Sequence, residues 1–246
     1  MTVGDELRKT LFLASDVRSG STYIAESLAY CLDRQFGYSF YDLAKELFSH
    51  LNNLSSAEEV LEIYNSLFLD ESGWSSSKLM CSSLSIIVRE SRRSNAVQLA
   101  FFGEAAFWII VRRRDRIKQA VSLAMARKSG LYHYYGDGEE YPDNKCELGK
   151  QEIQEALRAI ELSDTYLTVF KQLIPCSQYV EIFYEDFLDN EVKFINQVCQ
   201  LAGFGDAADP DAYVNLAKLR PTATETKSSY AEEFKFWLLE NYHPTQ

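Results

Sequence analysis

The sequence of 246 residues lacks the features that mark membrane and disulfide-rich proteins. No run approaches the ~18 consecutive apolar residues that a membrane span requires, and the first ten residues lead into only a short apolar stretch. The five cysteines are odd in number, widely spaced and never form a C-x-x-C pair, which argues against a disulfide framework and against a zinc site. We therefore expect a soluble, cytoplasmic protein without a signal peptide.

Positive charge is also scarce, because 25 lysines and arginines stand against 36 acidic residues and the formal net charge is −11. This balance excludes a broad nucleic-acid surface, which needs a wide cationic face. Between positions 89 and 128, however, ten basic residues outnumber three acidic ones, a local net charge of +7. Such a block in an acidic protein is typical of a site for a small anion. A solvated helix face is the alternative for Arg89, Arg92, Arg93, Arg127 and Lys128.

Short apolar runs alternate with longer segments of helical spacing, which predicts an α/β fold. Strands are expected at Leu11 to Ala14, Lys78 to Cys81, Ala106 to Val111 and Tyr179 to Tyr184. Helices are expected at 41–51, 57–69, 117–127, 153–173, 192–202 and 230–239. This alternation implies right-handed crossovers and a P-loop-like parallel β-sheet with helices on both faces. We expect residues 1–246 to form a single domain.

The first expected strand runs directly through Arg18, Ser19, Gly20, Ser21 and Thr22 into a helical pattern. Such a junction points the N–H groups of the first helical turn and the positive end of the helix dipole at one spot, where a phosphate or sulfate can bind. Ser21 and Thr22 add hydroxyl donors and Arg18 adds a forked cation. An ordinary turn, in which small residues allow close packing, is the alternative.

This loop lacks the lysine of a nucleoside-triphosphate P-loop, G-x-x-x-x-G-K-[ST]. Ser15 stands at the position of the first glycine, and Ser21 stands at that of the lysine. In P-loop enzymes the lysine and a magnesium ion neutralise the charge of the transferred group. The absent lysine therefore favours an anion with less charge than a triphosphate.

A second candidate anion site follows the third expected strand, which runs into Arg112-Arg113-Arg114-Asp115. Ligands of parallel sheets bind beyond the carboxyl ends of the strands, so both clusters should open on the same edge. Ser122 follows Arg114 by eight residues, a little over two helical turns. At that spacing the two side chains fit one phosphate together.

Several segments together resemble sulfotransferases that use 3′-phosphoadenosine-5′-phosphosulfate (PAPS), most closely the bacterial trehalose 2-sulfotransferase type. The segment LFLASDVRSGSTYIAESL resembles the 5′-phosphosulfate loop of that family, and VRRRDRIKQAVSLAMARKSGLYH resembles its 3′-phosphate motif. The segments FYEDFLDNEVKFINQVCQLAGF and SKLM resemble two further pieces, in the expected order. The resemblance implies a 5′-phosphosulfate site at Arg18, Ser19, Gly20, Ser21 and Thr22, and a 3′-phosphate site at Arg114 and Ser122, with Arg220 as a further cofactor-side cation.

The resemblance implies PAPS as donor and no metal, because a sulfuryl group carries less charge than a phosphoryl group. It also implies a hydroxyl of a carbohydrate, glycolipid or other small molecule as acceptor, and a possible homodimer. The sugar-specific members place a glutamate shortly after the first helix, where this chain reads QFGYSFYDLAKELF. The candidate general bases are therefore Asp42, Glu46 and His133. Ordinary helix carboxylates and a surface histidine are the alternatives.

Three further features of the sequence have an expected place in the structure. The tyrosine-rich stretch 130–149 has no apolar periodicity and is expected to be a mobile substrate loop, or else a disordered surface insertion. Tyr184-Glu185-Asp186 is expected to end a strand and cap the next segment, and Trp108 is expected in the core.

The sequence leaves two other functions open. One is a small-molecule kinase with an altered P-loop, against which the absent lysine counts. The other is a non-catalytic module that binds PAPS or a related nucleotide without turning it over.

Overall fold

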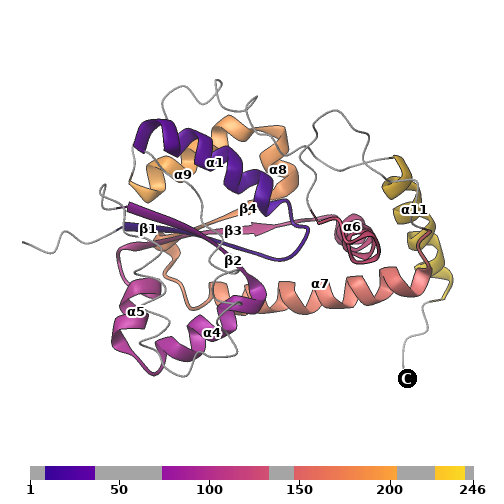
Figure 1. Ribbon diagram of the computed structural model, residues 1–246, viewed down its shortest axis with the longest axis horizontal. Helices are drawn as coiled ribbons and strands as arrows, with labels where there is room; N and C mark the ends of the chain where they lie inside the picture. The colour runs from indigo at the N-terminus through magenta and orange to yellow at the C-terminus, as the bar shows by residue number, and fades with distance from the viewer. Residues whose placement is uncertain (1–8, 37–73, 133–146, 204–224, 242–246) are drawn as a thin grey trace, which may run out of the picture.

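The computed structural model describes residues 9–36, 74–132, 147–203 and 225–241 (Figure 1). Its centre is a four-stranded sheet in the order β2-β1-β3-β4, in which every neighbouring pair is parallel. The strands are β1 (Lys9–Ser15), β2 (Trp74–Met80), β3 (Ala106–Arg112) and β4 (Tyr179–Phe183). All four expected strands are confirmed. Cys81 and Tyr184, expected in strands, instead begin helices.

Helices cover both faces of the sheet (Figure 1). One face carries α1 (Ser21–Phe36), α8 (Tyr184–Asp189) and α9 (Glu191–Ala202). The other face carries α4 (Cys81–Ser91), α5 (Asn95–Phe102) and α7 (Lys150–Lys171), and a short 3₁₀ turn, η2 (Cys176–Gln178), leads into β4. Beyond the carboxyl end of β3 lie α6 (Arg116–Ser129) and α11 (Glu225–Glu240), which pack on each other. The α/β fold with a parallel sheet between helices is confirmed.

The strand side chains alternate between two apolar cores, which explains the apolar runs within β1 and β3. Leu11 and Leu13 of β1 pack with α1 and α9, whereas Phe12 and Ala14 pack with α4, α5 and α7. Trp108 is fully buried as expected, stacks on Phe12 with ring centroids 4.6 Å apart, and donates a hydrogen bond from Nε1 to the carbonyl oxygen of Phe101 (2.9 Å).

The expected helices that fall within the described residues are confirmed as α6, α7, α9 and α11. The expected helices at 41–51 and 57–69 lie outside the described residues. No helix of the described ranges is both long and apolar enough to cross a membrane. That residues 1–246 form a single domain stays a prediction.

We predict that Trp108→Ala lowers the free energy of unfolding by about 3–5 kcal/mol, because it removes a fully buried ring and leaves a cavity. Urea unfolding followed by circular dichroism measures the change. Leu99→Ala on α5 is the control, since that side chain is 57% exposed, and it should cost no more than about 0.5 kcal/mol. Similar losses in the two variants would contradict the assigned core.

Candidate active site

The loop between β1 and α1 has a conformation that its residues do not favour by themselves. Arg18 has φ of +58°, in the left-handed region, and it is the sole non-glycine residue with positive φ among those described. This conformation costs an isolated non-glycine residue on the order of 1–3 kcal/mol. Gly20 also has positive φ (+85°), and a Cβ at this position would overlap the ring of Tyr184. The loop therefore depends on glycine at position 20 and on contacts that hold Arg18.

Two arginine contacts hold the loop at Arg18. Arg113 donates from Nη1 to the carbonyl oxygen of Arg18 (3.2 Å), and Arg18 donates from Nε to Ser122 Oγ on α6 (3.0 Å). The guanidinium of Arg18 also donates to the carbonyl oxygen of Tyr132, beyond the end of α6. The segments that follow β1 and β3 thus lie together at one edge of the sheet, as expected, and anion binding there stays a prediction.

A buried glutamine on α6 holds the beginning of the same loop. Gln119, with no exposed surface, donates from Nε2 to the carbonyl oxygen of Val17 (2.7 Å) and to Asp16 Oδ2 (3.2 Å). Asp16 Oδ1 accepts from the Val17 N–H (2.6 Å), and the Asp16 carbonyl oxygen accepts from Ser19 Oγ (2.8 Å). Gln119 and Ser122 lie three residues apart, on one face of α6. This helix face therefore fixes the loop at two places.

The carboxyl group of Asp16 is held in an unusual state for an aspartate. Burial raises its pKa from 3.8 to about 6, although the Val17 N–H, Ser163 and Arg116 favour the ionised form. The Asp16 side chain is 2% exposed. Sequence reasoning did not select Asp16 or Gln119. A single acidic residue directly after an apolar strand was the available signal for Asp16.

Two arginines of the basic block, at the end of β3 and at the start of α6, form ion pairs with neighbouring elements. Arg112 forms ion pairs with Asp164 and Glu181, both at 3.3 Å, and Arg116 also pairs with Asp164. Asp164 lies on α7 and Glu181 on β4. These contacts fix the turn between β3 and α6 against its neighbours.

Carboxylates of α8 hold the same turn from the other side. Glu185 accepts hydrogen bonds from the backbone N–H groups of Arg114 (3.0 Å) and Asp115 (3.2 Å). The guanidinium of Arg114 forms two hydrogen bonds with Asp186, which lower the pKa of that carboxyl, and lies over the Phe183 ring at 4.3 Å. Glu185 and Asp186 therefore have a structural role, as expected, but they act at the start of α6 rather than on their own helix.

The structure brings most of the expected donor-binding residues to one place. Arg18, Ser19, Gly20, Ser21 and Thr22 form the loop and the start of α1, and Ser122 contacts Arg18. Ser122 and Arg114 were expected to face one phosphate. Ser122 accepts a hydrogen bond from Arg18, and Arg114, whose side chain is half exposed, pairs with Asp186, so that their shared phosphate site stays a prediction.

Other expected positions lie elsewhere. Asp42, Glu46, His133 and Arg220 lie outside the described residues, as does most of the expected substrate loop at 130–149. Arg89 and Arg93 pair with Glu90 on α4, and Lys128 pairs with Glu152. These basic side chains belong to solvated helix surfaces, the alternative that the sequence offered for them.

Sequence reasoning gave no role to Lys78, although it lies at the loop. Its Nζ donates to Thr22 Oγ1 at 2.9 Å, across 56 residues of sequence. Lys78 lies in β2 and pairs with Leu13 of β1. A single lysine inside an expected buried strand was the signal that could have identified it.

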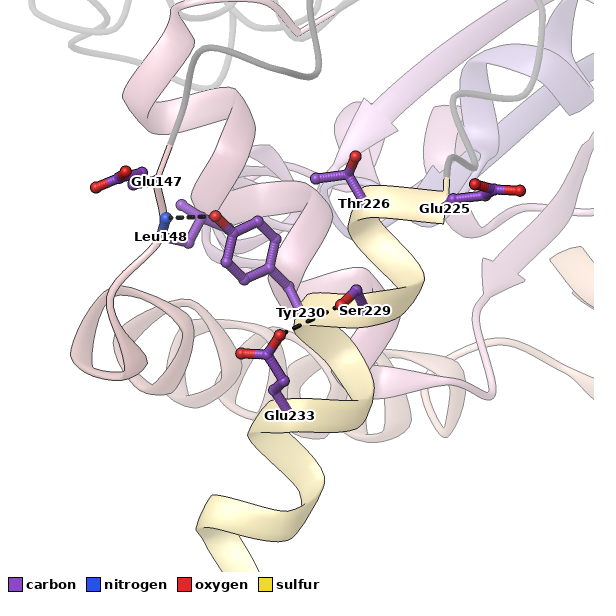
Figure 2. A pocket seen from close by; sticks show the side chains of 7 residues that line it. All are labelled: Glu147, Leu148, Glu225, Thr226, Ser229, Tyr230 and Glu233. Atoms are coloured by element: carbon purple, nitrogen blue, oxygen red, sulfur yellow. Dashed lines mark hydrogen bonds between the residues drawn. The ribbon is translucent and has the colours of Figure 1, made fainter.

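A separate cavity of about 670 Å³ lies beside the beginning of α11 (Figure 2). Figure 2 shows the hydroxyl of Tyr230 directed at the N–H of Leu148, which donates to it (3.3 Å), and Ser229 bonded to Glu233 (3.2 Å). Three carboxylates line the cavity, those of Glu147, Glu225 and Glu233. Their negative charge repels an anionic donor, so this cavity differs in chemistry from the loop at Arg18.

The sequence model of the Stf0 sulphotransferase family matches residues 65–235, more than two thirds of the chain. No curated protein matches the sequence significantly. Solved structures with similarity include the sulfotransferase domain of the Synechococcus PCC 7002 olefin synthase (14% identity over 92% of this chain and 94% of that one, TM-score 0.48). A sulfotransferase from Alicyclobacillus acidocaldarius is similar at 12% identity over 95% and 92% (TM-score 0.49). Retinol dehydratase, solved with androsterone and the inactive cofactor PAP, is similar at 14% identity over 96% and 83% (TM-score 0.42).

We predict that Asp16 makes the protein less stable as pH rises from about 4 to about 6. The unfolded chain releases the Asp16 proton near its ordinary pKa of 3.8, whereas the folded protein holds it to about 6, so the free energy of unfolding falls across this interval. Between pH 4 and pH 7 the wild type should lose about 2–3 kcal/mol more than Asp16→Asn does.

Urea unfolding of both proteins at several pH values measures this difference. Glu161→Gln on α7 is the control, because it removes an exposed carboxyl and should keep the wild-type pH dependence. Parallel pH profiles for the wild type and Asp16→Asn would show that the buried carboxyl is not the cause.

Proposed function

This chain belongs to the Stf0 sulphotransferase family, and we propose that it moves a sulfuryl group from PAPS to a hydroxyl of a carbohydrate, glycolipid or other small-molecule acceptor. The hydrogen bond between Arg18 and Ser122 carries this proposal. A donor with anionic groups at its 5′ and 3′ positions needs two neighbouring anion sites. The Arg18–Ser122 contact supports such a pair, because it joins the loop after β1 to the helix after β3.

The donor set of the loop fits a phosphosulfate group. The first turn of α1 contributes N–H groups and the positive end of its dipole, and Ser21 and Thr22 add hydroxyls. Arg18 adds a cation at the same end of the helix. In this proposal these residues hold the 5′-phosphosulfate, Arg114 and Ser122 hold the 3′-phosphate, and Arg220 is a further cation on the cofactor side.

PAPS supplies an activated sulfuryl group when it is bound. Transfer forms the bond between the acceptor oxygen and sulfur and breaks the bond from sulfur to the 5′-phosphate oxygen, which keeps the electron pair. The helix N–H groups and Arg18 act by orienting the anion and by stabilising the charge on that oxygen. A general base takes the acceptor proton, and Asp42, Glu46 and His133 remain the candidates.

The proposal also covers partners and location. We propose a small acceptor, no nucleic acid and a cytoplasmic protein, in line with the net charge of −11. A homodimer is supported by exposed apolar side chains on α7, where Leu162 is 74% and Val169 54% exposed, seven residues apart on one helix face.

We predict that the protein binds adenosine 3′,5′-bisphosphate and that binding requires the 3′-phosphate. Calorimetric titration with this nucleotide, with adenosine 5′-monophosphate and with ATP plus Mg²⁺ measures the preference. Arg114→Met and Ser122→Ala should each weaken binding about tenfold, because each removes a polar contact to an anion. Arg127→Met, at an exposed position on the same helix, should leave the affinity unchanged.

Other results would favour the other functions. Tighter binding of ATP with Mg²⁺ would indicate a kinase, and tight binding of PAPS that is never turned over would indicate a non-catalytic module. Equal affinity for the two adenosine phosphates, or unchanged affinity in both variants, would refute the 3′-phosphate site.

A further inference from the structure

Lys78 brings an ammonium group to a loop whose own sequence lacks the P-loop lysine. It pairs with Leu13 in the parallel register of β1 and β2, and paired residues point to the same face of a sheet. Leu13 packs with α1, whereas the next pair, Ala14 and Leu79, packs on the opposite face. The Lys78 side chain therefore runs on the α1 face, where its Nζ reaches the hydroxyl of Thr22 at 2.9 Å.

The position of this contact is informative because of what the hydroxyl does in a P-loop. On the G-x-x-x-x-G-K-[ST] pattern, Ser21 stands at the lysine and Thr22 at the final serine or threonine. In P-loop enzymes that final hydroxyl holds the magnesium ion, and the lysine binds the phosphates. In this chain, a lysine ammonium from a neighbouring strand lies on the hydroxyl where the metal would bind.

We propose that Lys78 is a catalytic residue that contacts the 5′-phosphosulfate and supplies the positive charge that a P-loop lysine and magnesium supply together. This inference rests on the proposed function, since it takes PAPS as the donor. The β1–β2 pairing fixes Lys78 beside β1, and Thr22 lies in the first turn of α1, directly after the loop that follows β1, so the ammonium is held at this place before the donor binds.

The role of Lys78 in the transfer follows from where charge develops. As the acceptor oxygen bonds to sulfur, the bond from sulfur to the bridging oxygen breaks. The electron pair stays on the 5′-phosphate of adenosine 3′,5′-bisphosphate, and the acceptor proton passes to the general base. Lys78 keeps its own proton and donates a hydrogen bond to the oxygen that gains charge. Its partial burial strengthens this interaction, because fewer water molecules screen it.

The test compares two ligands that differ in the 5′-phosphate alone. Lys78→Met keeps much of the side-chain length and removes the charge, and calorimetry with adenosine 3′,5′-bisphosphate and with adenosine 3′-monophosphate measures the effect on each. We expect the bisphosphate to bind about tenfold to a hundredfold more weakly, the range for a lost hydrogen bond to a charged group. Adenosine 3′-monophosphate should bind as it does to the wild type.

Three comparisons make the result specific. Lys171→Met removes another partly buried, paired lysine, whose partner is Glu181, and should change neither affinity. Lys78→Arg keeps the charge and should recover most of the affinity for the bisphosphate. At saturating PAPS, the release of adenosine 3′,5′-bisphosphate should fall at least tenfold in Lys78→Met.

An unchanged affinity for the bisphosphate, or an unchanged rate of release, would overturn the role of Lys78. An equal loss for both ligands would show a structural effect and would overturn it too, with Lys78→Gln as a second variant if Lys78→Met does not fold. Tenfold tighter bisphosphate binding by the wild type in Mg²⁺ than in a chelator would overturn the replacement of the metal. If the proposed function itself were wrong, the result would differ, because the nucleotide affinity of the wild type would then not depend on the 3′-phosphate.

Discussion

The hydrogen bonds that join residues 16–18 to α6 and to Arg113, just before it, are the constraint on which the whole proposed site depends. Arg18 has a left-handed backbone that costs energy, so the loop keeps this shape because other elements hold it. Gln119 holds the loop at Val17, and Arg113 holds it at the Arg18 carbonyl. The direction in which α1 begins, and therefore the direction of its first N–H groups, follows from the shape of this loop. A helix about a hundred residues away thus sets the geometry of the first helix.

The parallel sheet makes these long-range contacts possible. Because β1 lies between β2 and β3, the turns that follow β1 and β3 meet at one edge, and Lys78 of β2 reaches the same place from the other side. The arginines of the basic block have different partners. Arg112 and Arg116 pair with Asp164, and Arg114 donates two hydrogen bonds to Asp186, which hold it against α8. These arginines therefore fix the segment between β3 and α6 against its neighbours.

The sequence predicted β1, β3 and β4 well because their buried residues form apolar runs, whereas the first four residues of β2, Trp74 to Ser77, were missed because three of them are serines. It misplaced Cys81 and Tyr184, because each helix begins directly at the end of a strand and its first residues continue the apolar run. The loop from Arg18 to Thr22 was predicted because its residues are contiguous in the sequence, so the motif can be recognised without knowledge of the fold. Lys78 and Gln119 were missed because each acts through a contact that only the folded chain creates. The expected Arg114–Ser122 pair rested on helical spacing and on the family resemblance, and neither gives information on Asp186 as a partner of Arg114.

The distribution of charge explains how an acidic protein can offer a site to an anionic donor. Asp16 lies two residues before Arg18, and an ionised carboxylate there would weaken the positive field of the loop. Burial raises its pKa to about 6, so this carboxyl is neutral only below that pH and is mostly ionised at pH 7, and its amide partner Gln119 brings no charge of its own. The positive field at the loop comes from Arg18, Lys78 and the end of α1, which together outnumber the single Asp16 carboxylate. Since a sulfuryl donor needs compensation only at its two anionic ends, a few well-placed cations are sufficient, and the rest of the surface is free to remain acidic.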